Sequence, residues 1–91
     1  MAFVLPPQLT LAQVRSELER LQTELAARPA ALQVDAAALS DFDTGALALL
    51  LEGRRQAGAA GLGFEVQGAP VGLRQLAALH GVDGLLGLTP A

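Results

Sequence analysis

Cysteine, lysine, tryptophan and tyrosine are absent from this chain of 91 residues. Without cysteine there is no disulfide, no thiolate nucleophile and no thiolate metal site, which fits a reducing compartment. The basic side chains are six arginines, and the net charge is −3. Nucleic acids and anionic bilayers are bound by clustered basic side chains, which this composition does not supply. We therefore expect neither nucleic acid nor a membrane surface as a direct partner.

Long apolar runs are also missing. The longest, from Ala46 to Leu51, is far shorter than the ~20 residues that span a bilayer, and the N-terminus lacks the basic stretch of a signal peptide. We therefore expect a cytoplasmic protein without direct membrane insertion. Hydrophobic residues nevertheless make up 52% of the chain, and the mean hydropathy of +0.41 is high for a small monomer. This balance indicates that a partner covers part of the surface.

Few side chains suit catalysis. An enzyme needs several convergent titratable groups, and this chain has a single histidine, His80, at the end of an expected helix. His80 fits a helix-end histidine, whose cationic form interacts with the helix dipole, better than a general base. Asp41 and Asp43 flank Phe42, but two carboxylates are too few for a metal cage and suit a loop before a helix. We predict that the chain is not an enzyme and holds no metal or cofactor.

The first part of the chain predicts a strand, a helix and a second strand. Residues 2–5 are apolar and end at two prolines, which favours an edge strand. A helix is predicted over residues 10–28, because Thr10 and Gln13 suit a capping box and apolar residues recur three and four positions apart. Packing on a sheet is favoured over a coiled-coil seam, which needs a longer repeat. The apolar residues are Leu11, Val14, Leu18, Leu21 and Leu25.

The rest of the chain continues this alternation. A strand is predicted over 31–35 and a loop over 36–43; then follow a helix over 44–60, a strand over 62–67, a helix over 70–80 and a last half-strand or helical turn over 82–88. Strands that alternate with helices indicate an α/β fold, in which helices pack on a small, mostly parallel or mixed sheet. Residues 1–91 are short enough to make a single domain.

The helix over 44–60 is the most distinctive segment. Asp41 and Asp43 place negative charge before it, and Thr44 is expected to cap its first turn. One side of the helix is apolar, and the other carries small and polar residues that suit a solvated face or a docking surface. Docking is favoured, because small residues let a partner helix approach and few charges are present. The predicted partner interface comprises Asp43, Thr44, Gly45, Ala48, Leu49, Glu52 and Arg55.

The stretch from Asp43 to Leu51 also resembles a known family. Its sequence, Asp-Thr-Gly-Ala-Leu-Ala-Leu-Leu-Leu, stands between an apolar strand and a glycine-marked turn into another strand, as in STAS domains. The resemblance extends over about residues 9–88 and is greatest to the small STAS subunit of the Mla phospholipid ABC transporter. Ala46 stands where the family usually has a second glycine. We expect the N-terminal hairpin of the family to be reduced to one strand here.

This resemblance implies a STAS-like fold and a non-catalytic accessory subunit. It would bind and support the ATPase subunit of an Mla-type transporter, in the cytoplasm beside the inner membrane, with Thr44 at the contact. In anti-sigma-factor antagonists of the same family the equivalent Ser or Thr is phosphorylated by an anti-sigma-factor kinase, so phosphorylation of Thr44 is the alternative. A third interpretation is a small-ligand or lipid-binding module that uses the leucine-rich surface.

Overall fold

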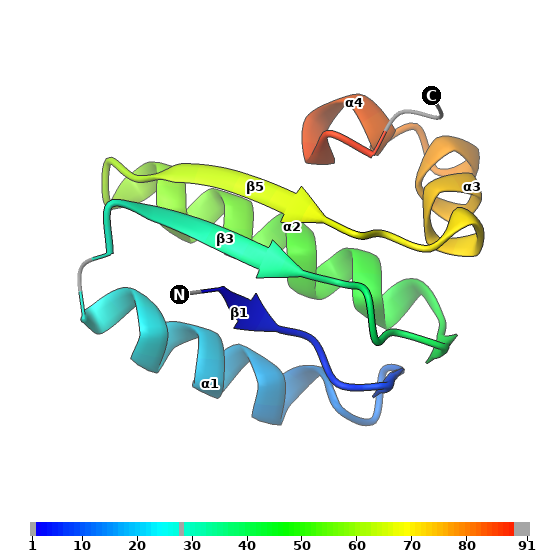
Figure 1. The fold of residues 1–91 in the computed structure, drawn as a ribbon, viewed down its shortest axis with the longest axis horizontal. Coiled ribbons are helices and arrows are strands. Elements are labelled where there is room, and N and C mark those ends of the chain that lie inside the picture. Colours follow the sequence, from blue (N-terminus) through cyan, green and yellow to red (C-terminus); the bar gives the residue numbers. More distant parts are fainter. Residues whose placement is uncertain (1, 28, 89–91) are drawn as a thin grey trace.

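The computed structural model describes residues 2–27 and 29–88 (Figure 1). Three strands, β1 (Phe3–Val4), β3 (Ala31–Asp35) and β5 (Gly63–Gln67), form a parallel sheet in the order β1-β3-β5. Two shorter strands, β2 (Gln8–Leu9) and β4 (Asp41–Phe42), form a second parallel pair. In the larger sheet, each pair of neighbouring strands is therefore connected along the chain through one helix.

Four helices accompany these strands in the described part of the chain. α1 (Val14–Ala26) and α2 (Thr44–Ala59) connect the strands of the larger sheet and pack against each other, because right-handed crossovers in one direction place both helices on the same face. α3 (Val71–Leu79) and α4 (Asp83–Leu86) follow β5 (Figure 1). The predicted α/β architecture is confirmed, and both sheets are parallel.

Alternating side chains on the strands place the core on the helix side of the sheet. Leu32 and Val34 of β3 are each 1% exposed, whereas Gln33 between them is exposed. The inward-facing strand residues share one hydrophobic cluster with Leu49 and Leu50 of α2, which are also 1% exposed. Among the described residues no polar or charged side chain is buried. Apolar burial therefore holds the fold together.

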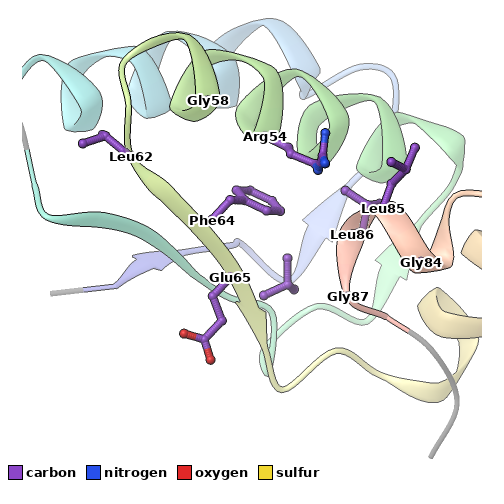
Figure 2. Close-up of a pocket in the computed structure, with 10 residues that line it drawn as sticks. Arg54, Gly58, Leu62, Phe64, Glu65, Gly84, Leu85, Leu86 and Gly87 are labelled. Carbon is purple, nitrogen blue, oxygen red and sulfur yellow. The ribbon is translucent and has the colours of Figure 1, made fainter.

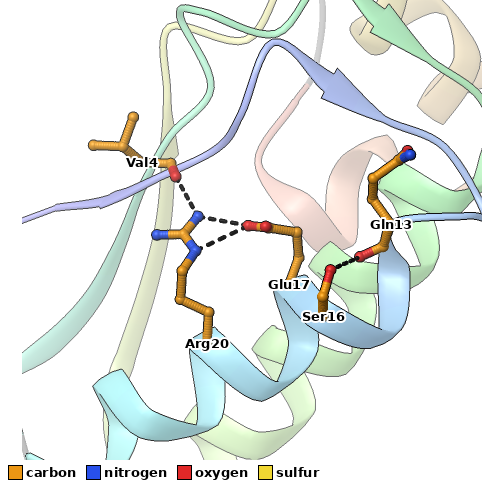
Figure 3. Close-up of polar contacts among 5 residues, drawn as sticks. All are labelled: Val4, Gln13, Ser16, Glu17 and Arg20. Atoms are coloured by element: carbon orange, nitrogen blue, oxygen red, sulfur yellow. Dashed lines mark hydrogen bonds and ion pairs between the residues drawn. The ribbon is translucent and has the colours of Figure 1, made fainter.

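An arginine on α1 ties that helix to the edge strand β1. The Arg20 guanidinium lies 4.1 Å from the centre of the Phe3 ring. It donates to the Val4 carbonyl, as Figure 3 shows. It also pairs with Glu17, whose Oε1 is 2.6 Å from the Arg20 Nη2 (Figure 3). Because β1 has only two residues, these contacts supplement its short ladder with β3.

α1 begins at Val14 rather than at residue 10. The expected contacts between Thr10 and Gln13 do form: the Gln13 Oε1 accepts from the Thr10 backbone N–H at 2.8 Å and from the Thr10 hydroxyl at 2.7 Å. These bonds close a turn ahead of the helix instead of capping it. Leu11 lies in this turn and is 66% exposed, so the prediction that it belongs to the apolar stripe is wrong. At the other end α1 stops at Ala26, and residue 28 lies outside the described residues.

The structure also differs from the prediction at β4, and at α4 it selects one of the two predicted alternatives. The sequence predicts a loop over residues 36–43, but Asp41 and Phe42 pair with Gln8 and Leu9. A strand of two residues is too short to show an alternating pattern. Near the C-terminus, residues 82–88 contain the helical turn α4 and not a half-strand.

The start of α2 is fixed by the turn that precedes α1. Asp43, not Thr44, is the N-cap: its Oδ1 accepts from the Gly45 N–H at 2.7 Å, and its Oδ2 accepts from the Leu11 N–H at 3.4 Å. A Cβ placed on Gly45 would lie 2.6 Å from the Leu11 nitrogen and 2.7 Å from the Thr10 carbonyl carbon. Only glycine lets two backbones approach so closely. The prediction that Thr44 caps this helix is therefore wrong.

The substitution Leu49→Ala tests whether Leu49 of α2 is buried in the hydrophobic core. Removing a buried leucine side chain loses its transfer free energy and leaves a cavity, so we expect the free energy of unfolding in urea to fall by about 2–5 kcal/mol. Leu79 is 80% exposed. The matched control Leu79→Ala is expected to change the free energy of unfolding by less than about 0.5 kcal/mol. Equal effects of the two substitutions would contradict the buried position of Leu49.

The substitution Gly45→Ala tests the contact between α2 and the preceding turn. Alanine is the better helix former by about 1 kcal/mol, but at this position its methyl group meets backbone that has to move, so we expect a net loss of about 1–3 kcal/mol. In the same helix, a Cβ on Gly58 meets no atom within 4 Å. Gly58→Ala is therefore expected to gain about 0.5–1 kcal/mol. Thermal unfolding of both variants checks the opposite signs, and stabilisation by Gly45→Ala would refute the contact.

Candidate functional site

A groove opens beside the N-terminal half of α2, with a volume of about 500 Å³. Three segments that are far apart in the sequence line it, and we call it the Thr44 groove. Five of its lining side chains are apolar, and the polar groups are one hydroxyl and one imidazole. The lining residues are Leu11, Thr44, Leu47, Ala48, Leu51, His80 and Val82.

One side of α2 forms the floor of the Thr44 groove. Thr44, Leu47, Ala48 and Leu51 follow one another at intervals of three, one and three, so they form a continuous stripe along the helix. Thr44 and Ala48 are exposed, Leu51 is half-buried and Leu47 is only 4% exposed. The floor therefore slopes from the surface into the hydrophobic core.

Two turns form the walls of the groove. The turn before α1 carries Leu11, which the close approach at Gly45 holds against the start of α2. The turn after α3 carries His80 and Val82, and the Val82 N–H donates to the Ala77 carbonyl at 2.9 Å. Leu11 and His80 are both exposed, so the groove is open to solvent along its length.

Thr44 lies at the surface end of the floor. It is the first residue of α2, and its hydroxyl makes no hydrogen bond within residues 2–27 and 29–88. The first backbone N–H groups of a helix have no partner inside the helix and form the positive end of its dipole. Asp43 accepts from one of them, that of Gly45. The Thr44 hydroxyl is therefore available to a group from outside the chain.

An ion pair follows the groove one turn further along α2. Arg55 hydrogen-bonds to the Glu52 carboxylate, which lowers the pKa of Glu52 and raises the pKa of Arg55 from their usual values. Solvent reaches both groups, so the pair contributes little to stability and is screened by salt. It is intact above the lowered pKa of Glu52 and is lost as the pH falls through that value. The pair gives the apolar groove a charged border.

Four of the predicted interface residues lie on this exposed side of α2. Thr44 and Ala48 line the groove, and Glu52 and Arg55 form its charged border. Asp43 is half-buried at the helix start, where capping and the contact with the Leu11 N–H occupy its carboxylate.

The other two predicted interface residues are buried by other segments of the chain. Gly45 is buried against the turn before α1, and Leu49 is 1% exposed. At 100° per residue, Leu49 is turned about 140° away from Thr44, so the two cannot share a face. The prediction that Gly45 and Leu49 are exposed is wrong, and neither offers area to a partner.

Five residues that line the Thr44 groove are absent from the interface predicted from the sequence. Leu47 and Leu51 were assignable from their spacing, because they complete an i, i+3, i+4, i+7 stripe with Thr44 and Ala48. The remaining residues come from other segments, and tertiary packing alone brings them to this site. They are Leu11, His80 and Val82.

The arrangement has the chemistry of a binding surface. The described residues hold no group of three or more histidine, cysteine, aspartate or glutamate side chains that is placed to bind a metal ion. Within the same residues, the helices are all too short or too polar to cross a membrane. An apolar groove of about 500 Å³ has room for side chains of another molecule. The Thr44 hydroxyl and the His80 imidazole are the polar groups of its lining.

Comparison with known proteins identifies the family. A family model described as "Mlab, STAS domain" matches residues 5–88, which contain every residue of the Thr44 groove. No curated protein matches the chain. Domains of this family are generally non-catalytic and act as small accessory or regulatory modules. This chain belongs to the STAS domain family, near its Mlab group.

Proposed function

We propose that this chain is a non-catalytic accessory subunit of an Mla-type phospholipid ABC transporter. In this proposal it docks on the ATPase subunit through the Thr44 groove and is held by that subunit at the cytoplasmic side of the inner membrane. The observation that carries the proposal is an open apolar groove centred on the exposed Thr44 and Ala48, in a chain of the STAS family. Hydrolysis of ATP belongs to the partner.

The shape of the groove favours a helix of the partner as its occupant. Ala48 has the smallest side chain of the floor, so a partner helix can approach α2 closely at this point. Leu11 and Val82 stand on either side and would enclose an apolar side chain of that helix. Specific interfaces commonly combine such an apolar centre with a polar rim, which the Glu52–Arg55 pair supplies here.

Docking of this kind regulates an ATPase through differential affinity. A subunit that takes no part in the chemistry shifts the equilibrium between two conformations of its partner only if it binds one of them more tightly. A preference of about 1.4 kcal/mol changes that equilibrium tenfold. In the proposal, the Thr44 groove binds the assembled, active conformation of the ATPase more tightly than the alternatives, so occupancy of the groove supports transport.

Regulation by phosphorylation is the second candidate, and the exposed Thr44 hydroxyl favours it. A phosphate at the first residue of α2 would lie at the positive end of the helix dipole. It would also bring a charge of about −2 next to Asp43 and the apolar Leu11 and Leu47. Such a charge would expel an apolar partner from the groove. The second candidate is therefore an anti-sigma-factor antagonist whose binding is switched off by a kinase.

The substitution Ala48→Arg tests the docking proposal. A long charged side chain would fill the floor of the groove, so we expect co-purification of the co-expressed transporter ATPase to fall at least about tenfold. The matched control is Ala59→Arg, which introduces the same side chain at an exposed position at the other end of α2. This control is expected to retain the ATPase. Full retention of the ATPase by Ala48→Arg would reject the groove as the docking site.

Thr44→Ala separates the candidate functions. In the docking proposal it weakens binding of the ATPase, because it removes the hydroxyl and one methyl group from the floor. If Thr44→Ala instead leaves the ATPase bound and abolishes kinase-dependent ³²P labelling, the transporter assignment is wrong and the regulatory one is favoured. Lipid in native mass spectra of the isolated chain would favour a lipid-binding module.

A further inference from the structure

A second surface, which shares no lining residue with the Thr44 groove, lies along the free edge of β5. β5 pairs with β3 on one side, and no described strand pairs with its other side. The Gln67 carbonyl accepts from the Ala36 N–H at 2.8 Å, so the peptide groups of Gln67 face β3. Because peptide groups alternate along a strand, the N–H and C=O groups of Phe64 and Val66 face the free edge. These groups are a template for another strand.

A groove with a volume of about 600 Å³ accompanies this edge, and we call it the β5 edge groove (Figure 2). α2 contributes Arg54 and Gly58, and α4 contributes the far wall with Leu85 and Leu86. Phe64 and Val66 point into the groove and are half-buried. The two residues whose peptide groups face the edge are thus the residues whose side chains line the groove. A strand added here would place every second side chain in the groove.

The charges beside the edge are separated between its two faces. Arg54 lies on the helix side and lines the groove, and it makes no ion pair within the described residues (Figure 2). Glu65 also belongs to the lining, but its carboxylate points away from α2, on the opposite face of the sheet from Arg54 (Figure 2). A side chain of an added strand that enters the groove therefore meets one cation and apolar groups. An acidic residue between two apolar ones complements this lining.

We propose that the β5 edge groove binds an extended segment of a partner protein, which adds a strand to the sheet and places apolar, acidic and apolar side chains in turn into the groove. An extended segment fits better than a second folded copy of the chain, because α4 stands beside the edge as the far wall of the groove. Main-chain hydrogen bonds supply affinity in such strand addition, and the alternate side chains supply specificity. The proposal is independent of the function proposed for the Thr44 groove.

A synthetic peptide tests this proposal with the full chain. The probe is acetyl-Thr-Val-Thr-Asp-Thr-Val-Thr-amide, whose palindromic sequence presents the same side chains in a parallel or an antiparallel strand. We expect a dissociation constant of about 1 mM or tighter, measured by amide chemical shifts in NMR titrations. The shifts should concentrate at residues 63–67 and 84–87 and leave Thr44 and Ala48 unchanged. Failure to bind, or shifts centred on the Thr44 groove, would overturn the proposal.

Charge exchange tests the role of Arg54. Replacing the central Asp of the peptide by Lys is expected to weaken binding about five- to tenfold, and Arg54→Glu is expected to reverse this preference. Arg15→Glu, which makes the same charge change at an exposed position on α1, is the control and should leave the preference for the Asp peptide unchanged. Equal binding of both peptides to the unsubstituted chain would overturn the proposal.

N-methylation of the peptide tests for strand addition itself. Methyl groups on the nitrogens of alternate residues block one edge of a strand and leave the other edge intact. One of the two alternate sets is expected to abolish binding and the other to leave it within about twofold, and the set that abolishes binding reports the strand direction. Equal effects of both sets would refute strand addition. A dimer of the chain in solution whose interface includes residues 63–67 would show that a second copy occupies the edge, which also overturns the proposal.

Discussion

The close approach of the Thr10–Leu11 backbone to Gly45 is the constraint on which the rest of the structure depends. The short pair of strands β2 and β4 leads directly into it, with Gln8 beside Asp41 and Leu9 beside Phe42. The Asp43 carboxylate then spans the two segments by accepting from both of them. This contact fixes where α2 begins, and it brings Leu11 next to Thr44. The Thr44 groove is thus a consequence of how the first two βα connections meet.

The same helix serves the core and the site, on opposite sides. Leu49 and Leu50 are buried, while Thr44 and Ala48 remain exposed in the groove. A helix that is apolar on most of its circumference is normally enclosed on all sides. Here the enclosure is incomplete at the N-terminal half, because the turns on either side stop short of covering it. In the proposed function the ATPase completes the enclosure, which agrees with the small number of charges on this surface.

The sequence predicts features that depend on the residues of one helix or strand, and it fails for features that depend on contacts between two segments. The strand over residues 31–35 and the helix over 44–60 follow from local periodicity, and β3 and α2 match them closely. The N-cap of α2 was misassigned because Asp43 and Thr44 are both good capping residues, and the choice depends on the Leu11 N–H from another segment. Leu49 was misplaced because it lies at the margin of the predicted face, about 140° from Thr44 but only about 60° from Glu52, and other segments bury it. The walls of the groove depend on tertiary packing that no local pattern encodes.

The order of the strands in the larger sheet has a consequence for how the chain assembles. Each of the pairs β1–β3 and β3–β5 closes across a single helix, so neither requires a distant segment to be inserted between two strands already formed. The entropy of loop closure is then spread over two similar steps, each the size of one βαβ unit. The spatial order of the strands, from β1 to β5, is also the order in which the ribosome releases them. β5, the last of these strands in the chain, is one of the two that keep an open side.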